Sequence, residues 1–205
     1  PTTPGKVTDE PQLSQGKLGN GLLMSGDNSA TVAPGGDFTR NQPFTISLWL
    51  QASTGYERAV VIHRSRAWTD SGSRGYELLI EDGKLSAALI HFWPGHALRV
   101  RAVVDLSLGR WVHVSMAYDG SSRASGLTLF VNGREADVVV VRDKLTKNIK
   151  GADGVGGGGV NELAIGQRFR DKGFKNGKLD ELRIFDRELS PLEQRFNYLR
   201  DDAPN

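Results

Sequence analysis

Aromatic and basic side chains gather in three segments that have the residue types needed to bind a ligand by stacking and hydrogen bonding. The densest segment is LIHFWPGHAL at 89–98, and HRSRAWTDSGSRG at 63–75 and RFRDKGF at 168–174 add tryptophan, phenylalanine and arginines. An aromatic plane suits the apolar C–H face of a sugar ring, whereas arginine, histidine and asparagine bind sugar hydroxyls. The candidate ligand-binding residues are Arg64, Arg66, Trp68, Arg74, His91, Trp93, His96, Arg168, Phe169 and Arg170.

These three segments make one basic and aromatic pocket only if the fold brings them together. Such a pocket favours an acidic or sulfated polysaccharide, because guanidinium groups bind carboxylates and sulfates in a two-point geometry. The alternative is structural: tryptophan and arginine also cover the ends of β-sandwiches, with the charged heads in water. Asp70, Asp171 and Glu77 are close enough in sequence to pair with the arginines.

Glu77 and Glu81 are the pair of carboxylates to compare with the catalytic pair of a glycoside hydrolase. On an extended strand their backbone positions lie about 13 Å apart, at about 3.3 Å per residue. A catalytic pair needs its carboxyl groups about 5 to 9.5 Å apart. We therefore expect both glutamates to be solvated strand residues and the protein not to be an enzyme.

Other chemistries lack their sequence signals. The four histidines show no helical i, i+4 metal pair, and the glycine-rich segment 151–159 has no Gly-Lys-Ser/Thr ending, so we expect it to be a long loop. Lys and Arg total 26 against 24 acidic residues, and this near balance does not predict a nucleic-acid or membrane-surface partner. No run of 18 apolar residues predicts a membrane span.

Alternation of apolar and polar residues predicts that these segments sit on an all-β scaffold. FTISLWLQ at 44–51, WVHVSMAY at 111–118 and LTLFV at 127–131 alternate at period two, and 179–185 marks a late strand. Turn signals separate such runs at Asp82-Gly83, Pro94-Gly95, Asp119-Gly120 and Asn132-Gly133. The spacing predicts about ten to twelve strands in an antiparallel sandwich or barrel, with the best hairpin at Asn132-Gly133.

The aromatic segment itself reads as a hairpin, with arms at 83–95 and 96–104 and its tip at Trp93-Pro94-Gly95-His96. Alternation places His91 and Trp93 on one face of the first arm. Phe92 falls on the other face, and we expect it to join the core.

A short C-terminal helix is predicted from Ser190-Pro191-Leu192-Glu193, which puts a hydroxyl at the cap, proline at the first helical position and glutamate three residues beyond the cap. Leu192, Phe196 and Leu199 then share a face, which we expect to pack against the sandwich. Residues 1–15 read as a linker or tail, and residues 16–205 as one domain.

Four segments carry a family resemblance that covers about residues 16–198. They are GKLGNGLLMSGDNSATV, FTISLWLQA, LGRWVHVSMAYDGSSRASGLTLFVNGRE and LAIGQRFRDKGFKNGKLDELRIFDRELSPLE. In this order they resemble the laminin G-like jelly roll of the concanavalin A-like lectin and glucanase superfamily. The middle and the end of the chain are further similar to versions inserted in large bacterial proteins that also carry cytochrome-c-like domains.

The resemblance implies a two-sheet jelly roll that binds ligands on one sheet face or at its rim. Relatives with glucanase activity carry an acid between two glutamates of one strand, where this chain has Leu79. Several relatives hold a structural calcium ion, for which the resemblance points to Asp27 and Asp180 as ligands; the alternatives are that Asp27 only makes a turn and that Asp180 accepts hydrogen bonds from one.

The sequence therefore predicts a non-catalytic carbohydrate-binding module of a larger, exported bacterial protein, located outside the cytoplasm. The partner is a carbohydrate, with acidic polysaccharide favoured by the arginines. The alternative is an interaction or spacer module that docks on neighbouring domains of its own chain, and a glycoside hydrolase has less support. Fold alone does not choose among these functions.

Overall fold

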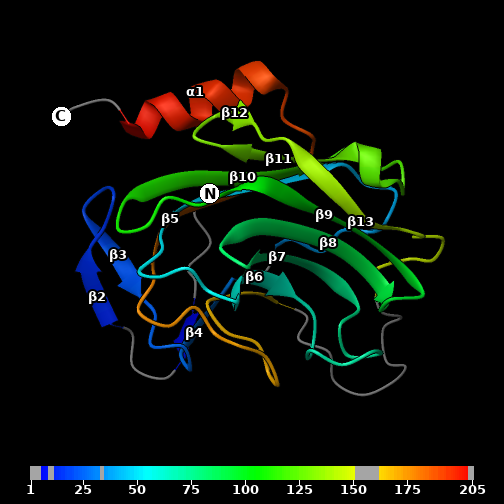
Figure 1. Cartoon of the computed structure of the whole chain (residues 1–205), viewed down its shortest axis with the longest axis horizontal. Coiled ribbons are helices and arrows are strands. Elements are labelled where there is room, and N and C mark those ends of the chain that lie inside the picture. The colour runs from blue at the N-terminus through cyan, green and yellow to red at the C-terminus, as the bar shows by residue number, and fades with distance from the viewer. Residues whose placement is uncertain (1–5, 9–11, 33–34, 151–161, 203–205) are drawn as a thin grey trace.

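The computed structural model describes residues 6–8, 12–32, 35–150 and 162–202, which form two antiparallel sheets packed face to face (Figure 1). In spatial order, the eight-stranded sheet contains β1 (Lys6–Thr8), β4 (Ser29–Val32), β14 (Leu163–Ile165), β6 (Arg58–Arg64), β7 (Gly75–Glu81), β8 (Lys84–Phe92), β9 (His96–Asp105) and β13 (Val138–Asp143). The seven-stranded sheet contains β12 (Arg134–Glu135), β11 (Leu127–Val131), β10 (Trp111–Tyr118), β5 (Phe44–Gln51), β15 (Lys178–Phe185), β3 (Asn20–Leu23) and β2 (Gln12–Gln15). The predicted all-β sandwich is confirmed, with more strands than the turn spacing indicates.

The extra strands are short edge strands that the alternation signal does not reveal. β1 and β2 fall within residues 1–15, the segment expected to be a linker or tail, and each pairs at or near a sheet edge, with β4 and β3 respectively. Runs of three or four residues are too short for period two to be read in the sequence. The glycine-rich segment 151–159 lies outside the described residues.

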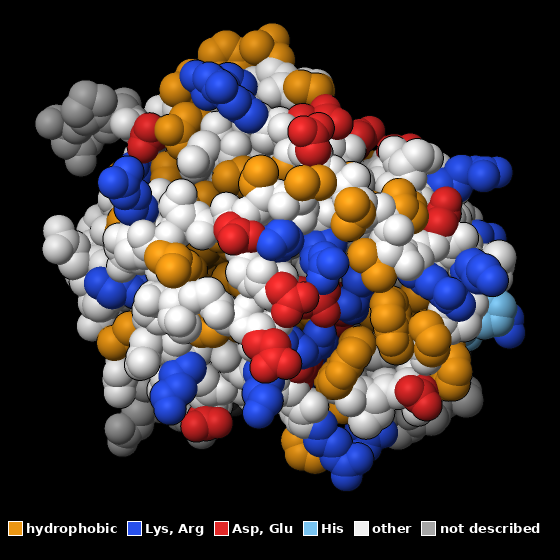
Figure 2. Space-filling view, in the orientation of Figure 1, with side chains coloured by type: hydrophobic (Ala, Val, Ile, Leu, Met, Phe, Trp, Pro, Cys, Tyr) orange, Lys and Arg blue, Asp and Glu red, His pale blue; other side chains and the backbone are white. Residues whose placement is uncertain are grey.

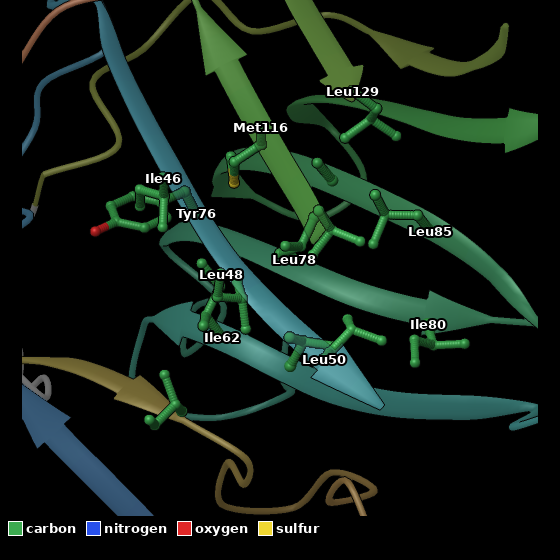
Figure 3. Packing of buried hydrophobic residues seen from close by; sticks show 14 of the residues in the cluster. Ile46, Leu48, Leu50, Ile62, Tyr76, Leu78, Ile80, Leu85, Met116 and Leu129 are labelled. Atoms are coloured by element: carbon green, nitrogen blue, oxygen red, sulfur yellow. The ribbon is translucent and has the colours of Figure 1, made fainter. Parts of the chain in front are cut away.

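The core lies between the sheets, where inward side chains of both sheets interdigitate (Figure 3). Ile46, Leu48 and Leu50 of β5 face Leu78 and other residues of the eight-stranded sheet, and all are buried. Each such side chain contributes about 1.5–3 kcal/mol by leaving water. The predicted hairpin at Asn132-Gly133 is also present, with both residues at positive φ between β11 and β12.

The C-terminal helix α1 (Pro191–Asp202) covers the outer face of the seven-stranded sheet (Figure 1). Its predicted cap is confirmed, because the Glu193 amide donates to Ser190 Oγ at 3.4 Å and the Ser190 amide donates to Glu193 Oε2 at 2.9 Å. This reciprocal pair satisfies two amides that have no partner inside the helix.

The expectation for the packing face of α1 is wrong. Leu192, Phe196 and Leu199 are 64%, 63% and 42% exposed, and the buried helix residues are Gln194, Asn197 and Asp201. The reason is that the sheet face under the helix presents hydrogen-bonding groups: Asn197 donates to Ser47 Oγ at 2.8 Å, and the Trp49 indole also points toward the helix. Figure 2 shows the resulting hydrophobic side chains on the exposed surface of the helix.

Asp201 provides the strongest contact between helix and sheet. Its carboxylate accepts bonds from Arg183 Nη1 at 2.5 Å and from the Trp49 indole at 3.1 Å, and its side chain is almost fully buried. Burial opposes its ionisation, but bonding to Arg183 and Trp49 outweighs this and holds the pKa of Asp201 below its usual range.

We expect Asp201→Asn to lower the free energy of unfolding by about 2–4 kcal/mol, because it removes the more deeply buried of the two carboxylates that pair with Arg183, the other being Glu181. Asp202→Asn is the matched control: it removes the half-exposed pair with Lys17, and such pairs contribute about 0–1 kcal/mol. Urea unfolding of both variants checks this. Equal losses would show that Asp201 does not hold the helix on the sheet.

Candidate functional site

Two of the three candidate segments meet on the outer face of the eight-stranded sheet. A parallel bridge joins Ala67 to Phe169, and the Trp68 amide donates to the Phe169 carbonyl at 3.1 Å. The segment 168–174 is also tied to the sheet, since the Val60 amide donates to the Lys172 carbonyl at 2.9 Å. The segment 168–174 thus lies across β6, with the tryptophan loop beside it.

Trp68 and Trp93 form an aromatic pair where these segments meet, with ring centroids 6.0 Å apart. Both pack on a small apolar patch of the outer sheet face made by Ala88, Ile90 and Ala97. The segment 89–98 therefore joins the site through Trp93, at the tip of the β8–β9 hairpin.

Guanidinium groups stack on both tryptophans. Arg58 lies 4.1 Å from the centroid of the Trp68 ring, and Arg99 lies 4.3 Å from that of Trp93. Arg168 approaches Trp68 at 5.2 Å. A cation at this distance from a ring face contributes about 0.5–2 kcal/mol, so the arginines fix the rings in place.

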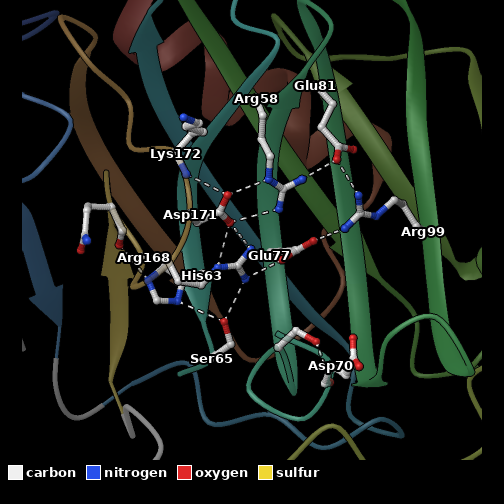
Figure 4. A network of polar contacts seen from close by, with 12 residues as sticks. Arg58, His63, Ser65, Asp70, Glu77, Glu81, Arg99, Arg168, Asp171 and Lys172 are labelled. Atoms are coloured by element: carbon white, nitrogen blue, oxygen red, sulfur yellow. Dashed lines mark hydrogen bonds and ion pairs between the residues drawn. The ribbon is translucent and has the colours of Figure 1, made fainter. Parts of the chain in front are cut away.

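The same three arginines belong to a network of ion pairs with three carboxylates (Figure 4). Arg168 pairs with Glu77 at 2.6 Å and with Asp171 at 2.5 Å, and Arg58 pairs with Asp171 at 2.7 Å. The members are Arg58, Glu77, Glu81, Arg99, Arg168 and Asp171. Their charges balance, which is what allows so many ions to be removed from water together.

The expectation that Glu77 is solvated is wrong, because its side chain is 0% exposed. Arg168 from the loop and Arg99 from β9 contact one carboxylate oxygen each. Burial opposes ionisation of Glu77, but the charges of Arg168, Arg99 and Arg58 outweigh it and hold its pKa below the usual range. Glu81, whose side chain is 17% exposed, pairs with Arg58 and Arg99 rather than standing free in solvent.

This arrangement does not suit Glu77 for acid catalysis. A general acid needs a pKa raised toward the working pH, and the arginines shift the pKa of Glu77 in the opposite direction. Arg99 also bridges Glu77 to Glu81, so both carboxylates are engaged in holding the face together.

A pocket of about 330 Å³ opens beside the network, lined by Arg58, Trp68, Arg170, Asp171 and Lys172. Arg170 and Lys172 are exposed, and neither makes an ion pair with any residue that the structure describes. Figure 2 shows acidic and basic side chains side by side over β6 to β9, with hydrophobic side chains directly beside them. The pocket thus has an aromatic wall, a balanced charged floor and a basic rim.

The β8–β9 hairpin contributes no residue to the lining of this pocket, and Trp93 is connected to it through Trp68. His91 Nδ1 lies 2.6 Å from the Asn148 carbonyl oxygen, and His96 Nδ1 lies 2.9 Å from Thr146 Oγ1. Arg74 donates to the His91 carbonyl at 3.2 Å, so its side chain lies beside His91 and not at the pocket. The expectation that His91 shares a face with Trp93 is wrong because the pairing register shifts between Ile90 and Phe92. Phe92, expected in the core, is 40% exposed, because it is the last residue of β8 and lies beside the hairpin turn.

The remaining candidates take separate places. Arg64 pairs with Asp37, away from the tryptophans, and Arg66 is exposed. Phe169 is exposed beside the pocket, with the Arg170 guanidinium 5.3 Å from its ring. Arg168 is fully buried in the network, so it supports the site rather than facing a ligand.

Arg58, Arg99 and Lys172 are the site residues that sequence reasoning missed. A usable signal was present, because Arg99 lies within the apolar run ALRVRAVV, and an arginine buried in a strand needs a carboxylate partner. Arg58 begins β6, directly opposite Glu81 in the register of β6 and β7.

The two aspartates expected to bind calcium do not form a ligand set by themselves. Both carboxylate oxygens of Asp180 accept backbone amides, from Leu18 at 2.9 Å and Glu181 at 2.8 Å. Asp27 lies in a turn in which its amide donates to Ser25 Oγ at 3.2 Å. In the part of the chain that the structure describes, no three acidic, histidine or cysteine side chains are grouped to hold a metal. Calcium binding stays a prediction.

A family model described as the concanavalin A-like lectin/glucanases superfamily, of laminin G type, matches residues 24–193. The chain belongs to this superfamily. No curated protein gives a significant sequence match. Within the described residues, no helix is both long and apolar enough to cross a membrane.

Solved structures with a fold similar to that of this chain include several binding domains. The binding domain of Paraclostridial Mosquitocidal Protein 1 has a TM-score of 0.69 at 17% identity, covering 97% of this chain and 47% of that one. The binding domain of botulinum neurotoxin serotype G has a TM-score of 0.70 at 11% identity, with 98% and 47% covered. This chain thus spans about half the length of those structures.

Domain 4 of AbnA, an extracellular arabinanase of Geobacillus stearothermophilus solved with arabinotriose, has a TM-score of 0.60 at 16% identity. The alignment covers 94% of this chain and 87% of that domain. At these identities the likeness shows the jelly-roll fold.

We expect Glu77→Gln to lower the free energy of unfolding by about 3–5 kcal/mol, because it leaves Arg99 and Arg168 buried without one of their counter-charges. Glu57→Gln, at an exposed position, is the control and should leave stability unchanged. Urea unfolding monitored by circular dichroism measures both. A small loss for Glu77→Gln would mean that the network is not what fixes this face.

We also expect the protein to lose stability between neutral pH and pH 5. Burial, with a smaller contribution from Arg168, lowers the pKa of His63 to about 4, and burial with the charge of Arg183 lowers that of His113 to about 4. The unfolded chain, with histidine pKa values of about 6.5, binds more protons in this range, so stability is lost as pH falls below about 6.5.

At pH 5 the loss is about 2 kcal/mol for each histidine, at about 1.4 kcal/mol per pH unit. Urea unfolding at pH 7.5 and pH 5.0 checks this, with His113→Leu as the test variant. The variant should show about half of the histidine-dependent loss, and an undiminished pH dependence would contradict the assignment of His113.

Proposed function

We propose that this domain is a non-catalytic carbohydrate-binding module. The observation that carries the proposal is the pocket on the outer face of the eight-stranded sheet, where a partly exposed Trp68 and its stacked Arg58 form one wall. The flat ring suits the C–H face of a sugar, and the guanidinium edges supply donors for hydroxyl groups. Arg58, Trp68 and Asp171 are held in place before any ligand arrives, which lowers the entropic cost of binding.

The favoured ligand is an acidic polysaccharide. The three arginines of the network do not themselves supply net positive charge, because three carboxylates neutralise them. Positive charge at the pocket comes instead from Arg170 and Lys172 at its rim. A uronate carboxylate or a sulfate group beside a ring stacked on Trp68 would lie within reach of both side chains.

The comparisons support binding as the activity. The arabinanase domain, which aligns over most of its length, was solved with arabinotriose, and the toxin structures are described as binding domains. Together with the family resemblance, this favours a module of a larger exported bacterial protein that acts outside the cytoplasm. The role of this chain in that setting is recognition, with catalysis left to other domains.

A second candidate function, docking on a neighbouring domain of the same protein, is favoured by α1. Its Leu192, Phe196 and Leu199 form an exposed apolar stripe on a helix that buries its polar side. An apolar helix face left in water is typical of a surface that packs against another domain. The two functions use opposite sides of the sandwich and are compatible.

We expect Trp68→Ala and Trp93→Ala to weaken polysaccharide binding about fivefold to tenfold each, since a stacking contact contributes about 1 kcal/mol. The isolated domain is first tested on an array of neutral and acidic glycans, and affinity for the best ligand is then measured by calorimetry. Arg170→Gln combined with Lys172→Gln should reduce binding of acidic glycans and spare neutral ones.

Trp111→Ala is the matched control, because Trp111 is a partly exposed tryptophan on β10 of the other sheet. Circular dichroism must show that each variant is folded. Unchanged affinity in the folded Trp68 and Trp93 variants, or no binding across the array, would remove the basis of the proposal and leave docking as the function.

A further inference from the structure

A second cavity lies at the other end of the sandwich, between the sheets rather than on the outer face. Its volume is about 170 Å³. The buried side chains of Leu48, Leu179 and Ile165 line it from inside, and the exposed Leu13 of β2 lies at its mouth. The cavity thus runs from the protein surface into the hydrophobic core.

A β-bulge in β15 shapes this cavity. In the register of β15 with β5, Asp180 pairs with Trp49 and Arg183 pairs with Ser47, so that Glu181 and Leu182 both stand opposite Leu48. All three of these residues line the cavity. A bulge redirects side chains locally, which is why the two strands leave space here instead of closing on the core.

The bulge holds Glu181 in a strained conformation. Its φ is 52°, in the left-handed region that non-glycine residues rarely adopt. Such a conformation costs about 1–3 kcal/mol and clusters at ligand-binding sites, so an observed outlier beside a cavity points toward function.

The two carboxylates that line the cavity, those of Asp180 and Glu181, are already engaged. Both oxygens of Asp180 accept amides of the chain, and the carboxylate of Glu181 pairs with Arg183. They are therefore not available to bind a charged ligand, and the inner wall consists of leucine and isoleucine side chains. An enclosed cavity of about 150 Å³ lined by aliphatic residues binds benzene, and the inner part of this open cavity has a similar volume and lining.

We infer that the cavity at the β15 bulge is a binding site for a neutral apolar group of about six to eight non-hydrogen atoms, an aromatic ring or a short branched alkyl group. It lies between the sheets, separate from the tryptophan pocket, and does not depend on carbohydrate binding. The domain then carries two recognition sites of opposite chemistry, one polar and basic, the other apolar.

The test uses methyl NMR spectra of the intact chain titrated with benzene, toluene and, as a polar ring of equal size, pyrimidine. Benzene or toluene should shift the methyl resonances of Leu22, Leu48, Leu179 and Leu182 saturably, with a dissociation constant in the millimolar range or below. Pyrimidine should not. Absence of saturable shifts, or equal shifts with pyrimidine, overturns the inference.

Leu182→Phe places a larger side chain at the cavity and should abolish the shifts, with Leu22→Phe as a second variant if the first does not fold. Leu108→Phe, at an exposed leucine elsewhere, is the control and should retain them. Toluene shifts that persist in a folded cavity-filling variant would show that toluene binds at another place.

Discussion

The burial of Glu77 is the constraint on which the outer face of the eight-stranded sheet depends. A carboxylate at the centre of a sheet is tolerated only when cations neutralise it, and Arg99 and Arg168 approach it from two sides. Arg168 comes from a distant loop, so the pairing fixes that loop across β6. Arg58 and Asp171 extend the network to the pocket, which makes the position of Trp68 a consequence of how one buried charge is neutralised.

The scaffold was predictable from the sequence, because its signals are local. Period-two alternation in 44–51 and 111–118 identified central strands, and Ser190 with Glu193 identified the start of the helix. The meeting of segments 63–75 and 168–174 depends on strand order, which alternation does not encode. The sequence therefore left open whether these two segments converge.

Failures of prediction came where a side chain's environment depends on another part of the fold. Glu77 looked solvated because the residues that bury it are 22 and 91 positions away in the chain. The helix was expected to bury leucine and phenylalanine, yet it packs through hydrogen bonds to Ser47 and Trp49 of the sheet. A one-residue register shift beyond Ile90 separated His91 from Trp93, and nothing in LIHFWPGHAL marks that shift.

Arg170 and Lys172 lie at the rim of the pocket but outside the ion-pair network. Substitutions at these two positions therefore do not disturb the charges that keep the loop folded. Changes at the rim alter the charge and shape of the pocket while the buried network keeps the loop in place. In a domain built in this way, the residues at the pocket rim can differ between relatives without a large change in the free energy of unfolding.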